Sequence, residues 1–191
     1  MDRSVVLARA SAQLPLLKVQ PGAVVRLKVL ALRVAWFATH WLGRRQVLCA
    51  AGRDGECAGC ALSPSRVVGF QLVTLVIDRR ERLFLLEVSP LAISSLEMSA
   101  KFEGVSRLGG ILVEVRRPRA RGPLRFEVVE ECSESIDPAE GDARLINAVA
   151  VLYGLPLLFI GETVEAWEER VSPMVRSLVS VAAGAVVGKS V

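Results

Sequence analysis

One short segment holds almost all of the metal-binding side chains of this chain, and it constrains the fold more than any other feature. The chain has one histidine and four cysteines, and the spacing is His40-x8-Cys49-x7-Cys57-x2-Cys60. Structural zinc is typically held by four Cys or His ligands in a tetrahedron. In a Cys-x2-Cys pair, two intervening residues let backbone amides turn towards both thiolates. The segment therefore predicts one structural zinc ion on His40, Cys49, Cys57 and Cys60.

Other uses of these residues fit the sequence less well. A redox Cys-x2-Cys pair begins a helix in a βαβ context, whereas this pair ends a glycine-rich segment after a strand. His40 also has an ordinary interpretation as a half-buried histidine beside Trp41. Cys132, much farther along the chain, is the competing fourth ligand. Disulfides are not expected in an intracellular chain.

No enzyme motif accompanies these ligands. Zinc deaminases combine H-x-E with P-C-x2-C, whereas here Trp41 follows His40 and Glu56 precedes Cys57. The chain has no G-x-S-x-G or P-loop sequence and no second histidine. Three cysteines and one histidine also leave no open position for water on the metal. We therefore expect a closed site and no enzymatic activity.

The rest of residues 1–130 is rich in strand signals. Ser89 and Pro90 have the residue types of a helix N-cap and first turn, for a helix that ends near Ala100. Residues 40–66 lose periodicity and are predicted as a long irregular connection. Five runs of β-branched, aromatic and aliphatic residues are predicted as strands: residues 23–39, 67–77, 82–88, 111–117 and 124–130.

This order of elements is the connectivity of the OB-fold. That fold is a five-stranded Greek-key barrel with a helix between its third and fourth strands, and its first-to-second and fourth-to-fifth loops flank the ligand face. The sequence therefore predicts a mainly β (α+β) domain over residues 1–130. In it, a zinc subdomain at residues 40–66 is inserted between the first and second strands of an OB-fold-like barrel.

Residues 131–191 are expected to form an acidic linker and a helical C-terminal appendage. Asp137 and Pro138 begin a capping sequence for a helix that reaches about Tyr153. Two further helices are predicted: residues 162–170 and 173–187. The last is apolar nearly all round, so it should pack against the barrel or against another chain. Residues 137–191 could thus serve self-association or a protein partner.

Charge divides along the chain in the same place. Residues 1–130 hold 20 Lys and Arg against 11 Asp and Glu, a net +9, and residues 131–191 hold 4 against 9, a net −5. A basic domain followed by an acidic segment is frequent where the ligand is a polyanion. Single strands need cations for phosphates and aromatic faces for bases. The candidate nucleic-acid-binding residues are Arg26, Lys28, Trp41, Arg44, Arg45, Arg116, Arg117, Arg119, Arg121 and Arg125.

The order of His40, Cys49, Cys57 and Cys60 in a loop of a predicted OB-fold resembles the zinc-containing single-stranded DNA-binding proteins of T-even phages. In that family a zinc-stapled subdomain is built into an OB-fold, the cleft between them binds single strands, and an acidic C-terminal part contacts replication partners. The resemblance covers about residues 23–130, with shorter ligand spacings here. It implies a single-stranded DNA-binding protein of replication, recombination or repair. The residues themselves leave two alternatives open, an RNA-binding module and an OB-fold adaptor that binds a protein through its C-terminal helices.

No membrane partner is expected. A bilayer-spanning helix needs ~20 apolar residues, and the most apolar stretches, residues 145–160 and 178–187, are interrupted or too short. Arg9, Ser11 and Gln13 interrupt any apolar core of a secretion signal. The sequence therefore predicts a cytoplasmic protein.

Overall fold

The computed structural model describes residues 12–51, 57–77, 80–105, 107–120, 122–131 and 138–187. The chain forms two compact units, and each unit combines two separate stretches. Unit 1 consists of Met1–Ala35 and Gly69–Ala148, and unit 2 of Trp36–Val68 and Val149–Val191. The sequence suggests a domain boundary after residue 130. Whether the chain folds independently on either side of that boundary stays a prediction.

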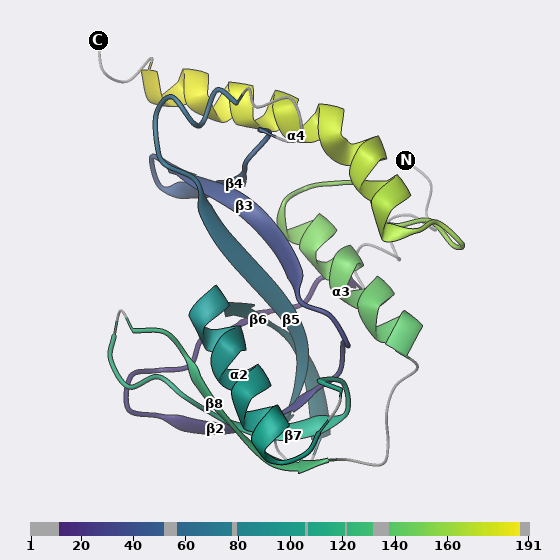
Figure 1. Ribbon diagram of the computed structural model, residues 1–191. Coiled ribbons are helices and arrows are strands. Elements are labelled where there is room, and N and C mark those ends of the chain that lie inside the picture. The colour runs from purple at the N-terminus through teal and green to yellow at the C-terminus, as the bar shows by residue number, and fades with distance from the viewer. Residues whose placement is uncertain are drawn as a thin grey trace. The chain divides into compact units, whose positions relative to one another are not determined.

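The described residues form an α+β fold with a mixed eight-stranded sheet and three helices, two of them C-terminal (Figure 1). The strands are β1 (Leu16–Leu17), β2 (Val24–Val29), β3 (Ala35–Leu42), β4 (Arg45–Leu48), β5 (Arg66–Ile77), β6 (Arg80–Val88), β7 (Ile111–Arg116) and β8 (Arg125–Glu131). The helices are α2 (Pro90–Phe102), α3 (Pro138–Leu152) and α4 (Val164–Val187). Strands are hydrogen-bonded in the order β1-β6-β5-β2-β7-β8, and β3 pairs with both β4 and β5.

The local signals of the sequence are confirmed in unit 1. Both predicted hairpins are present, as the antiparallel pairs β5–β6 and β7–β8. Ser89 caps α2, because its hydroxyl accepts a hydrogen bond from the Ala92 N–H at 3.3 Å, and Pro90 occupies the first turn. Helix α3 begins at the predicted Pro138. Its cap residue Asp137 lies outside the described residues.

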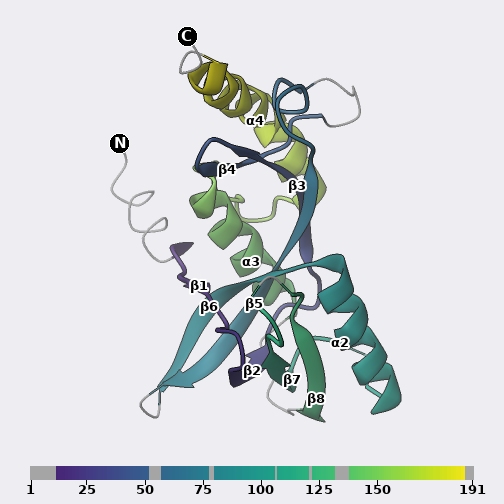
Figure 2. The same ribbon diagram turned by 90° about the vertical axis from the view of Figure 1, so that its left-hand side faces the viewer.

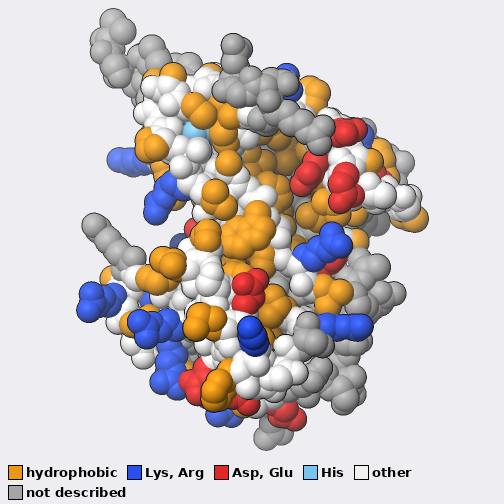
Figure 3. Space-filling view, viewed as in Figure 1, with side chains coloured by type: hydrophobic (Ala, Val, Ile, Leu, Met, Phe, Trp, Pro, Cys, Tyr) orange, Lys and Arg blue, Asp and Glu red, His pale blue; other side chains and the backbone are white. Residues whose placement is uncertain are grey.

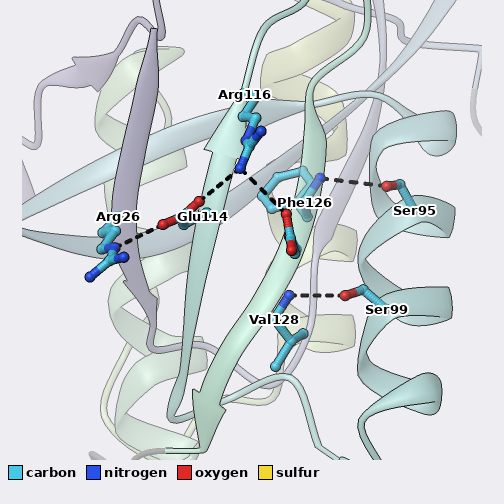
Figure 4. A network of polar contacts seen from close by, with 8 residues as sticks. Arg26, Ser95, Ser99, Glu114, Arg116, Phe126 and Val128 are labelled. Atoms are coloured by element: carbon cyan, nitrogen blue, oxygen red, sulfur yellow. Dashed lines mark hydrogen bonds and ion pairs between the residues drawn. The ribbon is translucent and has the colours of Figure 1, made fainter.

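The prediction of a closed barrel is wrong, because both edges that would have to meet are already occupied. At β8, the backbone N–H groups of Phe126 and Val128 donate to Ser95 Oγ at 3.5 Å and Ser99 Oγ at 2.9 Å on α2 (Figure 4). At β6, the short strand β1 pairs in parallel along the outer edge (Figure 2). A helix and an extra strand therefore cover the edges that barrel closure would join.

The core of unit 1 lies between the sheet and α2. Along α2 the buried positions are Ala92, Ile93, Leu96 and Ala100, which fall on one face of a helix. The strands contribute alternate residues, as expected when one face of each strand is buried. These strand residues are Leu27, Val29, Val73, Leu86, Val88, Ile111, Val113, Val115, Phe126 and Val128.

Two predicted elements have different limits. The strand predicted at residues 23–39 is divided into β2 and β3, since the chain leaves the ladder after Leu30, whose N–H still donates to the Leu72 carbonyl of β5 at 2.9 Å. The Ala31 carbonyl accepts a hydrogen bond from the side chain of Gln71 on β5 at 3.2 Å rather than from a backbone N–H of that strand. The connection predicted at residues 40–66 is not wholly irregular, because it contains the end of β3 and all of β4.

The two helices predicted at residues 162–170 and 173–187 are one helix, α4, which continues through Pro173. Proline removes one helical hydrogen bond and usually ends or kinks a helix. Here Trp167, Val171 and Val175 are all buried and follow each other at a spacing of four residues. This buried stripe extends on both sides of the proline, so side-chain packing outweighs the lost bond. Among the described residues, no helix is long and apolar enough to cross a membrane.

Candidate metal centre

All four predicted metal ligands converge within unit 2. His40 lies on β3, Cys49 directly follows β4, and Cys57 and Cys60 lie at the ends of a turn. Pairing of β3 with β4 sets Cys49 in place, since its N–H donates to the Ala38 carbonyl at 2.7 Å. One nitrogen and three sulfur atoms come within 4.8 Å of one another. The cluster could therefore hold a metal ion such as zinc.

Three of the six separations between candidate ligand atoms match a tetrahedral zinc site. Zn–S bonds of ~2.3 Å and a Zn–N bond of ~2.0 Å at tetrahedral angles require about 3.8 Å between sulfurs and about 3.5 Å between sulfur and nitrogen. The Cys49 and Cys60 sulfurs are 3.8 Å apart. His40 Nε2 is 3.6 Å from the sulfurs of both Cys57 and Cys60. A zinc ion at the centre would fit these separations without rearranging them.

The imidazole of His40 is oriented by a second contact. Its Nδ1 lies 2.8 Å from the backbone carbonyl oxygen of Ser63. A carbonyl only accepts hydrogen bonds, so this contact requires the proton on Nδ1 and leaves the Nε2 lone pair directed at the sulfurs. The ring is fully buried, which holds this orientation. This is the usual support of a metal-binding histidine.

Gly59 permits the turn to approach the histidine ring. A Cβ atom at this position would lie 2.7 Å from His40 Cδ2, which is closer than carbon atoms approach without displacement. The turn itself is closed by the Cys60 N–H, which donates to the Cys57 carbonyl at 3.0 Å. The glycine of the Cys-x2-Cys pair therefore serves close packing against His40.

The pKa values of Cys49 and Cys57 are shifted in opposite directions. Burial raises the pKa of Cys49 to about 11, and the neighbouring sulfurs of Cys60 and Cys57 add to this. Burial also disfavours the thiolate of Cys57, but backbone N–H groups, chiefly that of Ala50 at 3.4 Å, lower its pKa to about 6. A second negative charge beside the Cys57 thiolate is unfavourable without a cation. A divalent metal ion would remove this penalty, because zinc binds thiolates.

The competing arrangements receive no support from the described cysteines. Cys49, Cys57 and Cys60 are all free thiols in the structure. Cys132, the alternative fourth ligand, lies outside the described residues. His40 occupies the fourth position of the cluster together with these three cysteines.

Three of the candidate nucleic-acid-binding residues lie at the end of the β3–β4 hairpin in unit 2. Trp41 is 50% exposed, and Arg44 and Arg45 are exposed at the turn. Gly43 has a positive φ of 63°, which a tight hairpin turn of this kind requires. Trp41 follows the buried His40 directly, and successive strand residues point to opposite faces. The hairpin therefore presents its tryptophan away from the metal cluster.

Two further candidates, Arg26 and Arg116, lie in unit 1 and already pair with acidic side chains. Arg26 on β2 binds Glu114 of β7 at 2.9 Å, and Arg116 binds the same carboxylate at 3.1 Å (Figure 4). Arg116 also lies 3.6 Å from Glu127. These contacts hold the pKa of Glu114 below its ordinary value, with Arg26 as the larger cause. Two of the predicted phosphate ligands are thus already paired.

The other unit 1 candidates differ in exposure. Lys28 is half-buried, whereas Arg119 and Arg125 are exposed. Arg117 is half-buried, and its Nε is buried without a hydrogen-bond partner among the described atoms. Arg121 lies outside the described residues. The structure therefore divides the predicted set between two units.

Sequence reasoning missed two supporting residues. Glu114 could have been found, because it precedes Arg116 by two positions in a strand and so shares its face. Ser63 acts through its backbone carbonyl, for which the sequence carries no signal.

No protein-family model, no curated protein and no solved structure matches this chain.

Proposed function

We propose that this chain is a zinc-stapled, OB-type module that binds single-stranded nucleic acid, with DNA as the expected ligand and no enzymatic activity. The observation that carries the proposal is the β3–β4 hairpin. One face contributes the buried His40 to the metal cluster, the other exposes Trp41, and the turn that joins the two strands carries the exposed Arg44 and Arg45. An exposed aromatic ring could stack on a base, and the arginines of the adjoining turn could bind phosphates of the same strand.

Each side chain of the hairpin end has a defined role in this proposal. A base that stacks on Trp41 contributes ~1–3 kcal/mol regardless of its identity, because every base has a π-face. Arginine binds phosphate in a bidentate fork and releases counterions, so Arg44 and Arg45 would supply salt-dependent affinity. Binding of this type favours single strands, since a duplex keeps its bases stacked inside.

The strand order supports the OB part of the proposal. The five predicted strands correspond to β2, β5, β6, β7 and β8, and their hydrogen-bonded order is β6-β5-β2-β7-β8. Helix α2 lies between the third and fourth of them in the chain. OB-folds share this connectivity and are commonly only partly closed. The metal-binding hairpin falls between the first and second strands, where the loop flanks the ligand face in that fold.

Zinc would act here as a structural crosslink. When bound, it joins the hairpin to the Cys57–Cys60 turn, and its binding energy stabilises the fold. Side chains, and not the metal ion, would contact the nucleic acid. In unit 1, Lys28, Arg119 and Arg125 make no ion pair with the residues that the structure describes, so they could add phosphate contacts.

Fluorescence anisotropy with labelled dT20, its RNA counterpart and a duplex of equal length tests the proposal. We expect the zinc-loaded protein to prefer single strands and to lose affinity as salt rises. Replacing Arg44 and Arg45 with Ala should flatten the log–log salt slope by roughly 0.7 for each lost phosphate contact. Replacing Trp41 with Ala should lower affinity by ~1–3 kcal/mol with little change in slope.

Arg144→Ala is the matched control, because Arg144 is exposed on α3 and pairs with Glu140. It should leave both affinity and salt slope unchanged. A preference for the RNA strand would assign the module to RNA. Absence of single-strand binding by the zinc-loaded protein at low salt would make the proposal wrong.

A further inference from the structure

Unit 2 contains a groove that the proposed nucleic-acid site does not use. It has a volume of about 510 Å³, within the ~300–1,000 Å³ typical of ligand sites. Figure 3 shows hydrophobic side chains gathered around a hollow, with acidic side chains along one edge of it. Its lining is mainly apolar and includes Trp36, Phe37, Leu48, Trp167, Val171 and Val175.

One wall of the groove is formed by buried residues of α4. Trp167 is only 1% exposed, and its indole N–H donates to the Pro156 carbonyl at 2.8 Å. Val171 and Val175 extend this wall along the same face of the helix. Trp36 on β3 remains 40% exposed, so its ring is accessible to a ligand. The groove therefore combines an apolar wall with an available aromatic surface.

One residue of the metal cluster, with the two residues that follow it, forms another part of the lining. Cys49, Ala50 and Ala51 line the groove. The Ala50 N–H donates to the sulfur of Cys57, and the Ala51 N–H to that of Cys49, both at 3.4 Å. The path of this wall is thus tied to the ligand sulfurs. A ligand of the groove should consequently bind best to the metal-loaded protein.

The acidic side chains in and near the groove indicate which class of ligand it would bind. Among the described residues that line the groove, Glu168 is the one acidic or basic side chain. Glu165 and Glu169 are exposed on the same helix. Partial burial, together with Glu165, raises the pKa of Glu168, so a nearby positive charge would stabilise its carboxylate. Acidic groups repel phosphates, which argues against a nucleic acid in this groove.

We propose that the groove docks a short segment of a partner protein that carries an aromatic or large aliphatic side chain next to a lysine or arginine. The apolar side chain packs against Trp36 and the α4 wall, and the cation pairs with Glu168. This interaction is separate from nucleic-acid binding, because Trp41, Arg44 and Arg45 do not line the groove. The chain would then connect a single strand to a second protein.

A second copy of the chain is the main competing occupant. Unit 2 exposes Phe159 and the fully exposed Ile160 in one loop. The cation beside them, Arg170, stacks over the Phe159 ring at 4.0 Å and is already paired with Glu162 at 2.7 Å. This loop therefore lacks an available positive charge for Glu168. This loop of a second copy therefore fits the groove less well than a segment that carries an available cation.

Selection from a random heptapeptide phage library on the zinc-loaded full-length protein tests the proposal. Enriched peptides should combine a large apolar residue with Lys or Arg, and a labelled synthetic copy should bind in solution. Trp36→Ala should weaken that peptide about tenfold, as for a residue that carries much of an interface. Glu168→Gln should weaken it about threefold to fivefold, as expected for a partly exposed ion pair.

Two controls separate this proposal from the nucleic-acid proposal. Glu87→Gln, on the exposed face of β6, should leave peptide binding unchanged, and so should Trp41→Ala. Enriched peptides that are acidic or share no apolar anchor would overturn the docking proposal, as would full binding to both Trp36→Ala and Glu168→Gln. Self-association that Ile160→Asp abolishes would show that a second copy occupies the groove. If dT20 competes with the peptide and Trp36→Ala removes that competition, a nucleic-acid base occupies the groove.

Discussion

His40 Nδ1 lies 2.8 Å from the backbone carbonyl oxygen of Ser63, three residues beyond the metal-ligand candidate Cys60. The segment that supplies two sulfurs therefore also orients the imidazole that completes the set. Such support of a metal-binding histidine changes metal affinity by about 10–100-fold when it is lost. Because the contact is made by the backbone, its loss requires a change in the path of the segment rather than of one side chain.

Purified protein is expected to contain one zinc ion per chain. Cys57→Ser and Cys60→Ser should each lose the metal and lower the melting temperature, because metal binding energy contributes to folding. Elemental analysis after chelator-free purification, together with thermal unfolding, measures both effects. Cys132→Ser is the control and should retain zinc. A metal-free wild-type protein would show that the cluster does not bind zinc.

Gly59→Ala should weaken zinc binding about 10–100-fold, in the range of other changes to the surroundings of metal ligands. The added Cβ would come within 2.7 Å of His40 Cδ2, so either the ring or the turn must move. Competition with a chromophoric chelator gives the affinity. Ala58→Ser, at the exposed neighbouring position, should leave it unchanged. Equal affinities for the two variants would contradict the close approach of the turn to the ring.

Ser99→Ala is expected to destabilise the fold by ~1–3 kcal/mol, the cost of leaving a backbone N–H without its partner. Ser99 Oγ accepts the hydrogen bond of Val128 at 2.9 Å, and Val128 is buried. Urea unfolding measures the difference. Ser94→Ala, on the exposed face of α2, should change stability little. If the two serines behave alike, α2 does not satisfy the edge of β8.

Stability should depend on Glu162 in mildly acidic solution. Hydrogen bonds from Arg170 lower the pKa of Glu162 from 4.5 to about 2. Since the folded pKa lies below the unfolded one, this contribution is fully present above pH 4.5 and is lost as the pH falls towards 2. The difference in melting temperature between wild type and Glu162→Gln should therefore shrink over that interval. A difference that stays constant from pH 6 to about 2.5 would disprove the effect.

Truncation after residue 136 tests the domain limit that the sequence suggests. This truncation removes Trp167, Val171 and Val175 from unit 2, and with them the buried stripe of α4. We expect the shortened chain to melt at a lower temperature and to bind zinc less tightly than the full chain. A truncated protein with unchanged metal affinity and melting temperature would instead show that residues 1–136 fold independently of the C-terminal helices.

The sequence predicted the features that depend on neighbours along the chain. Ser89 and Pro90 located the start of α2, and alternation located both hairpins, because capping and strand patterns are local. The four metal-ligand candidates were found for the same reason, since they lie within one short segment.

Barrel closure could not be judged in this way. It depends on which partners occupy the edges of β6 and β8, and those partners are the two-residue strand β1 and the hydroxyls of Ser95 and Ser99. A strand of two residues shows no periodicity, and serine hydroxyls in a helix give no sign of a strand beside them. Helix α4 likewise continues through Pro173 because of tertiary packing that the local pattern does not contain.

The division of unit 2 between Trp36–Val68 and Val149–Val191 has a consequence for biosynthesis. The ribosome completes the metal-binding segment long before it reaches α4, so the cluster can take up its ion while the groove still lacks one wall. Domains generally fold as units once their residues are available, starting from the N-terminal side. On the docking proposal, a nascent chain that is metallated early would still lack the binding groove for the proposed partner until α4 has been made. Partner binding would then select for finished molecules.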